Sequence, residues 1–202
     1  MTLTVGIFLF DEVEVLDFAG PFEVFSTASR VYSYLNPEAP KPFKVITLAL
    51  DSGPIYARAG LQVQPSHTID NHPPIDVLII PGGVVTAQLE RQPVIEWIVR
   101  SAAHASLTAS VCTGAFLLAK AGLLDGFTVT THWEDIPDLR RMFPKISVME
   151  GRRWVDAGKI VTSGGISAGI DMSLYLVARL TDRELAVKTA RQMEFDWQSP
   201  TH

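Results

Sequence analysis

Almost wholly apolar segments alternate along this chain with segments of helical character, and this alternation limits the folds open to it. Residues 3–10 (LTVGIFLF) and 76–80 (DVLII) are rich in apolar and β-branched residues, without regular polar–apolar alternation. Strands of this kind are buried on both faces, as in the middle of a parallel sheet. Because helical segments separate such strands, we predict an α/β protein with an open, mostly parallel central sheet covered by helices.

The remaining elements are predicted from hydrophobic periodicity and turn residues. Further strands are expected at 43–50, 107–111 and 127–131, a short hairpin or edge excursion at 55–65, and a hairpin at 147–162. Helices are expected at 17–34, 93–105, 113–124, 133–143, 165–180 and 182–195. Pro21 is expected in the first turn of the first helix, and Val94, Ile95, Ile98 and Val99 on one face of the second. The chain has no internal repeat or linker, so we predict a single domain over residues 1–202.

Composition and charge limit the kinds of molecule that this protein is expected to bind. The chain has 202 residues, of which 47% are hydrophobic and 19% charged, enough apolar material for one packed core. The formal charge of −5 leaves no basic footprint for nucleic acid or an anionic membrane. Neither a signal peptide nor an apolar run of about 18 residues is present in the sequence. We therefore expect a cytoplasmic protein that acts on a small molecule and binds neither nucleic acid nor membrane.

Cys112 is the only cysteine, so an intramolecular disulfide or a cysteine-based metal cluster is excluded. It stands between the predicted strand 107–111 and the predicted helix 113–124, where a tight turn would form a nucleophile elbow. At such an elbow the helix N-terminus is expected to favour the thiolate and lower the pKa of the thiol. The alternative is an inert core residue, because free cysteines are among the most buried residues.

Two other strand ends carry candidate groups, because ligands bind at the carboxyl ends of strands in open α/β sheets. The backbone amides of Pro81–Gly83 could form half of an oxyanion hole, with the Thr113 amide as the other half, or simply a turn. Asp17 stands just before a predicted helix, where an N-cap is the plain explanation. Spacing alone does not single out a catalytic acid among Glu12, Glu14, Asp17 and Glu23.

The histidines give a weaker signal. His132 lies at the end of the predicted strand 127–131, 20 residues after the cysteine, and could equally be a structural residue. The other histidines are scattered, so we assign no metal site.

Together these segments resemble a known family. The motifs that carry the resemblance are DFAGP at 17–21, IPGG at 80–83, SVCTGAF at 110–116, AGLLDG at 121–126, TTHW at 130–133 and TSGGI at 162–166. In this order they resemble the ThiJ/PfpI superfamily of class I glutamine-amidotransferase-like proteins, which includes the parkinsonism-associated deglycase. The resemblance covers nearly the whole chain. Within the superfamily the motifs are most similar to those of bacterial isonitrile hydratases and of AraC-type regulator sensor domains.

The resemblance implies a flavodoxin-like three-layer sandwich, usually dimeric, with Cys112 as nucleophile and Asp17 as the neighbouring acid. It implies that the amides of Gly83 and Thr113 form the oxyanion site. Asp rather than Glu at position 17 matches the hydratase-like branch. Thr113 stands where peptidase-like members have histidine, which disfavours a peptidase. His132 matches a histidine near the cysteine of deglycase-like members.

We therefore expect a cofactor-independent, cysteine-dependent hydratase that converts a small isonitrile into an N-substituted formamide. Phe18, Gly82, Trp133 and Ile166 are expected to line the substrate pocket. Three alternatives remain: a non-enzymatic ligand sensor, a glyoxalase or deglycase acting on methylglyoxal, and a redox sensor at Cys112.

Overall fold

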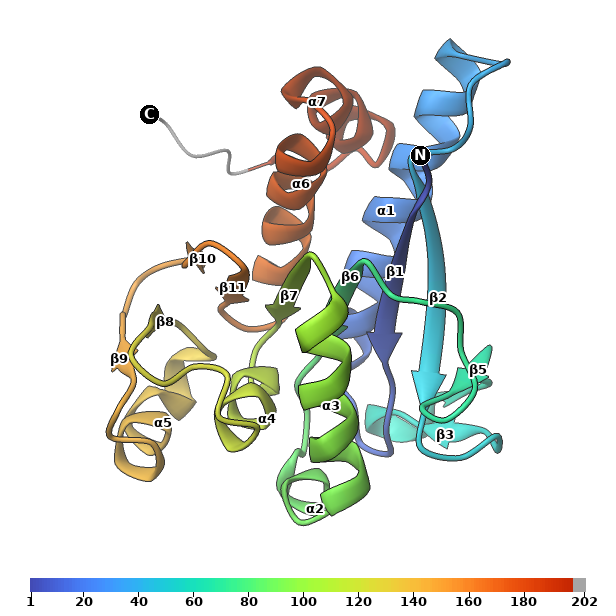
Figure 1. The fold of residues 1–202 in the computed structure, drawn as a ribbon. Helices are drawn as coiled ribbons and strands as arrows, with labels where there is room; N and C mark the ends of the chain where they lie inside the picture. Colours follow the sequence, from blue (N-terminus) through green and yellow to red (C-terminus); the bar gives the residue numbers. More distant parts are fainter. Residues whose placement is uncertain (198–202) are drawn as a thin grey trace.

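A seven-stranded sheet forms the centre of the molecule in the computed structural model, which describes residues 1–197 (Figure 1). The strand order is β10-β11-β7-β6-β1-β2-β5, and every pair is parallel except β10–β11. The strands are β1 Leu3–Phe8, β2 Phe43–Ala49, β5 His67–Thr68, β6 Val77–Ile80, β7 Leu107–Ser110, β10 Trp154–Asp156 and β11 Ile160–Ser163. The prediction of a mostly parallel central sheet is confirmed.

Helices cover both faces of this sheet, which gives the three layers expected (Figure 1). One face carries α1 Val15–Leu35, α6 Ala168–Leu180 and α7 Arg183–Gln192, which pack on one another. The other face carries α2 Thr86–Leu89, α3 Gln92–His104 and α4 Gly114–Lys120. α5 Ile136–Met142 follows the 3₁₀ turn Trp133–Asp135 and contacts β9.

Two small sheets complete the fold. The predicted hairpin at 55–65 is confirmed, because β3 Ile55–Tyr56 pairs antiparallel with β4 Gln62–Val63 across the 3₁₀ turn Arg58–Gly60. The expected strand 127–131 is shorter, β8 Thr128–Val129, and pairs in parallel with β9 Ser147–Val148 outside the central sheet. The expected hairpin at 147–162 is therefore limited to β10 and β11.

Two helix predictions need correction at their N-termini. α1 begins at Val15, so Pro21 lies inside the helix and not in its first turn. Since proline has no N–H, the Asp17 carbonyl has no helical hydrogen-bond donor at position 21. The helix expected from residue 165 begins only at Ala168, because Ile166 has a φ of 51°, outside the helical region.

One buried face was also predicted imperfectly. In α3, Val94, Ile95 and Ile98 are buried as expected, whereas Val99 is 41% exposed and Trp97 takes its place in the core. Residue 99 lies beyond the edge of a face centred on 94 and 98, because each residue advances 100° around the helix.

The topology brings three loops together at one edge of the sheet. β1 lies between β6 and β2, with β7 next to β6, so the carboxyl ends of β1, β6 and β7 are adjacent. The loops that follow these strands lead to α1, the Pro81–Gly83 turn and α4. This is the switch point at which open α/β sheets bind ligands.

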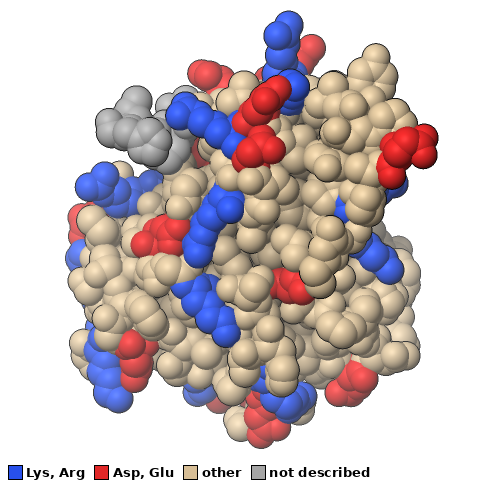
Figure 2. Space-filling model, turned by 45° about the horizontal axis from the view of Figure 1, so that its top comes forward, with Lys and Arg blue, Asp and Glu red and all other residues tan. Residues whose placement is uncertain are grey.

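The surface carries mixed charge. On the face in Figure 2, lysine and arginine side chains are interspersed with aspartate and glutamate rather than gathered into one patch. Across residues 1–197, none of the helices combines the length and apolar character needed to cross a bilayer.

Candidate active site at the Cys112 elbow

Cys112 occupies a strained turn between β7 and α4. Its φ is 56°, in the left-handed region that a cysteine rarely adopts. Hydrogen bonds on both sides hold this conformation. The Cys112 amide donates to the carbonyl oxygens of Ser163 and Gly164, both at 3.2 Å, and the Thr131 hydroxyl donates to the Cys112 carbonyl at 2.8 Å. This geometry is that of a nucleophile elbow.

Two glycines allow the end of β6 to approach the elbow. A Cβ on Gly114 would overlap the carbonyl oxygen of Ile80. A Cβ on Gly82 would lie 2.5 Å from the Thr113 nitrogen and 2.9 Å from the Cys112 Cβ. Both positions therefore require glycine, as a consequence of backbone contact and not of turn conformation.

Asp17 lies fully buried in the first turn of α1. Its carboxyl accepts hydrogen bonds from the Gly82 amide at 3.1 Å and from the Ile166 amide at 3.2 Å. The N-cap of α1 is Glu14, so the alternative interpretation of Asp17 as a helix cap is wrong. The carboxyl instead joins the loop after β6 to the segment before α6.

The protonation of both groups is set mainly by burial. Burial is the main reason that the pKa of Asp17 is raised to about 7. The hydrogen bond from the Gly82 amide lowers this pKa, and the charge of Glu14 raises it. Burial, and to a smaller extent the charge of Asp17, raise the pKa of Cys112 to about 12. Hydrogen bonds from the amide and hydroxyl of Thr113 lower this pKa but do not offset the effect of burial. The expectation of a lowered thiol pKa is therefore wrong, because loss of water outweighs the helix N-terminus. The site holds a protonated thiol beside a carboxyl group that titrates near neutrality.

Thr113 ties the elbow to the loop after β6. Its hydroxyl donates to the Gly83 carbonyl and accepts from the Gly83 amide, both at 2.9 Å. The Gly83 amide predicted for the oxyanion site is thus bonded to this hydroxyl. The Thr113 amide is directed at the Cys112 sulfur, where it lowers the pKa of the thiol.

His132 belongs to a second group of residues at the site. Its Nδ1 lies 3.2 Å from the Asp135 carboxylate, and its ring packs so closely on Gly165 that a Cβ there would overlap it. Asp135 acts directly on the site, since its charge raises the pKa of the Cys112 thiol. Sequence reasoning missed Asp135, although its spacing of three residues from His132 was a usable signal.

The expected pocket residues are only partly brought together. Ile166 reaches the site through its amide, and its side chain is 41% exposed. Trp133 is 73% exposed beside the His132 ring, with centroids 5.8 Å apart. Phe18 lines a different, mainly apolar groove of about 790 Å³ that neither Trp133 nor Ile166 lines.

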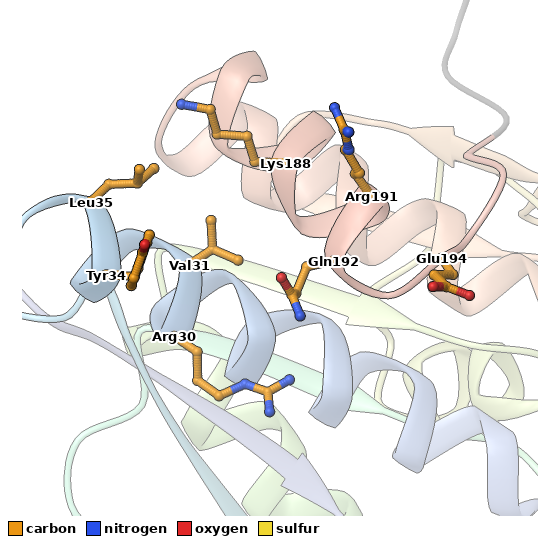
Figure 3. A pocket seen from close by; sticks show the side chains of 8 residues that line it. All are labelled: Arg30, Val31, Tyr34, Leu35, Lys188, Arg191, Gln192 and Glu194. Atoms are coloured by element: carbon orange, nitrogen blue, oxygen red, sulfur yellow. The ribbon is translucent and has the colours of Figure 1, made fainter.

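A hollow of about 900 Å³ between α1 and α7 belongs to none of these residues (Figure 3). It contains Arg30, Lys188 and Arg191, whose charged ends point in different directions. Arg30 pairs with Glu23 and Lys188 with Glu184, so this hollow does not converge on one ligand. Among residues 1–197, no group of three or more His, Cys, Asp or Glu side chains is placed to hold a metal ion.

Fold and site together define a flavodoxin-like α/β protein with a buried cysteine at the elbow and an acid from the first helix beside it. The family model described as "DJ-1/PfpI family" matches residues 3–179, and the chain belongs to that family. It is 35% identical to an isonitrile hydratase from Pseudomonas putida over 196 residues, covering 96% of this chain and 79% of the relative.

Two further relatives show the breadth of the family. The HTH-type transcriptional regulator GbdR from Pseudomonas aeruginosa is 28% identical over 96% of this chain, which spans 51% of that regulator. A crystal structure of a ThiJ/PfpI family protein from Pseudomonas syringae superimposes with a TM-score of 0.85 at 26% identity, covering all of this chain and 78% of the other. The family therefore places this domain both in an enzyme and in longer regulators.

Proposed function

We propose that this protein hydrates a small isonitrile, R–NC, to the N-substituted formamide R–NH–CHO, with Cys112 as nucleophile. The observation that carries the proposal is the pairing of a buried thiol with a buried carboxyl whose pKa is about 7. Such a carboxyl can accept and return a proton at neutral pH, which this addition requires. The 35% identity to an isonitrile hydratase supports the choice of substrate.

In the first step, Asp17 takes the thiol proton as the sulfur attacks the terminal isonitrile carbon. A C–S bond forms, and the proton passes from Asp17 to the same carbon, which gives the thioimidate R–N=CH–S–Cys112. The Thr113 amide, directed at the sulfur, stabilises the negative charge that develops there.

In the second step, water adds to the thioimidate carbon. Asp17 accepts a proton from the water and donates one to the nitrogen. The tetrahedral adduct then breaks its C–S bond, releases the formamide and returns the proton to the Cys112 thiol. The overall reaction adds one water to the isonitrile, with no electrons exchanged.

A ligand sensor is the second candidate, because the chain is also similar to transcriptional regulators over 96% of its length. A sensor binds its ligand without converting it, so measuring product formation distinguishes the two functions.

The proposed reaction also requires a reduced thiol, and we accordingly propose a cytoplasmic location.

The test is purified protein with an alkyl isonitrile and chromatographic measurement of the formamide. Wild type is expected to turn over repeatedly, and Cys112→Ala to make no product above the uncatalysed rate. Asp138→Asn serves as a control, because Asp138 pairs with Arg141 on α5. Wild-type turnover no greater than that of Cys112→Ala would refute the proposal.

A further inference from the structure

The charges nearest the thiol are negative and come from two separate parts of the chain. Asp17 follows β1 and is held by the amides of Gly82 and Ile166. Glu14, one turn earlier, is fixed through its amide, which donates to the Gly82 carbonyl at 2.9 Å. Its charge acts on Asp17, as that of Asp17 acts on Cys112.

On the other side, the 3₁₀ turn before α5 supplies Glu134 and Asp135. Both face the His132 ring, with carboxylate oxygens 3.9 Å and 3.2 Å from Nδ1. The ring is fixed against Gly165, one residue before the Ile166 amide that binds Asp17. The two acidic groups therefore border the same site.

One of the positive charges near these loops is already paired with an acid. Arg58 in the β3–β4 hairpin donates its backbone amide to the Val13 carbonyl at 3.0 Å, and its guanidinium lies 4.0 Å from the Glu12 carboxylate. Both side chains are about half exposed, so Arg58 offsets Glu12 more than it offsets the buried Asp17.

An exposed aromatic surface accompanies the acids. Trp133 lies between His132 and Glu134 in sequence and is 73% exposed, with its ring centroid 5.8 Å from that of His132, so most of the indole is accessible to a ligand. An indole face beside carboxylates attracts cations, by the ring quadrupole and by charge.

We propose that this site selects electrophiles whose unreactive part carries a positive charge, such as amine-bearing isonitriles, and discriminates against carboxylate-bearing ones. The choice of isonitriles rests on the proposed function. The charge preference is a property of the site itself.

The first test compares three isonitriles of similar length at pH 8: 3-(dimethylamino)propyl isocyanide, n-pentyl isocyanide and 4-isocyanobutanoate. We expect kcat/KM to fall in that order, with the cation favoured over the anion by about tenfold or more. Added salt is expected to reduce the difference, because exposed charges are screened. Equal values for cation and anion would overturn the proposal.

Substitutions of the acidic residues test which carboxylates cause the preference for cationic isonitriles. Glu134→Gln and Asp135→Asn are each expected to reduce the cation-to-anion ratio. Asp138→Asn removes the same charge three residues away and is expected to leave the ratio unchanged, since Asp138 pairs with Arg141. An unchanged ratio in both Glu134→Gln and Asp135→Asn would contradict the assignment.

The second test does not depend on turnover. Cys112 is labelled with a trimethylammonium-ethyl or a sulfonatoethyl methanethiosulfonate, and each rate is divided by the rate with a small free thiol. In this reaction the Cys112 sulfur attacks the reagent's thioalkyl sulfur, a disulfide forms, methanesulfinate leaves and the thiol proton passes to Asp17. We expect faster normalised labelling by the cation, and equal or reversed rates would refute the charge preference.

The two tests separate the two claims. Cation-selective labelling without formamide from any isonitrile would reject the hydratase and keep the charge preference. Formamide production without charge selectivity in either test would support the hydratase and reject the charge preference.

Discussion

The Asp17 carboxyl forms a hydrogen bond with the Cys112 thiol. The direction of the pKa shifts of these two groups predicts how activity depends on pH. The Asp17 carboxylate that accepts the thiol proton is populated above its pKa of about 7. We expect kcat/KM for an isonitrile to rise as pH increases through about 7 and then level off.

In Asp17→Asn this rise should disappear and kcat/KM should fall by roughly 10²-fold or more. Initial rates of formamide production from pH 5.5 to 9 measure both effects. A wild-type profile that falls as pH rises through 7 would contradict the role of Asp17 as a base.

Gly82 gives a second prediction at the same scale. In Gly82→Ala the new Cβ would meet the Thr113 nitrogen and the Cys112 Cβ, so the loop after β6 must move away from the elbow. We expect labelling of Cys112 by thiol reagents and formamide production both to change by more than tenfold, a shift of about 1.4 kcal/mol or more in activation free energy.

Gly53→Ala is the matched control, because a Cβ at Gly53 meets no atom of residues 1–197 within 4 Å. Thiol labelling rates and turnover in this variant should equal those of wild type. Wild-type rates in Gly82→Ala would show that the close approach is unnecessary.

Much of the site was predictable at the residue scale. The elbow at Cys112 followed from a strand, a small-residue turn and a helix in succession, and Asp17 from the family motif. The bond from the Ile166 amide to Asp17 was not, because it joins residues 149 apart and depends on a positive φ at a β-branched residue. The sign of the thiol pKa shift was also missed, because burial of the sulfur is a property of the folded chain.

At the scale of elements, one hydrogen bond joins α3 to the segment before β6. The Trp97 indole N–H donates to the His72 Nε2 at 3.0 Å, and the His72 Nδ1 lies 2.8 Å from the Pro73 carbonyl. Indole can only donate, so this geometry requires the His72 tautomer with its proton on Nδ1.

We predict that His72→Leu destabilises the protein by about 1–3 kcal/mol, because the buried Trp97 N–H loses its acceptor. Urea unfolding followed by tryptophan fluorescence measures the change. His104→Leu is the control, since His104 is exposed and its side chain, within the described part of the chain, bonds only to the Arg100 carbonyl of its own helix. Equal unfolding midpoints for His72→Leu and wild type would contradict the prediction.

Elements with a strong periodic pattern were predicted well, and those set by tertiary pairing were not. The strand 76–80 and the helix 93–105 agree with the structure to within one residue. β8 and β9 have two residues each, and which strand such a short segment pairs with depends on packing rather than on its sequence. α7 ends at Gln192, three residues before the predicted end at 195.

For the whole molecule, we propose a homodimer, the commonest oligomer of soluble proteins and the one that the resemblance implies. The groove of about 790 Å³ along α1 is the candidate interface, because Leu16 and Phe22 expose apolar side chains there. Light scattering after size exclusion should give twice the 22.2 kDa chain mass.

Phe22→Glu is expected to shift the protein toward monomer. Tyr34→Glu, which alters an exposed aromatic residue of the same helix outside this groove, should remain dimeric. A monomeric wild type at micromolar concentration would reject the dimer, and a dimeric Phe22→Glu would reject this interface.

The contact between His132 and Gly165 has a consequence for how the family can vary. The imidazole occupies the space that a side chain at position 165 would need. A residue with a Cβ at position 165 therefore requires the His132 ring to move or a smaller residue to stand at position 132. An alignment in which both positions carry large residues in the same sequences would show that the two loops can separate, whereas strict covariation would mark them as one evolutionary unit.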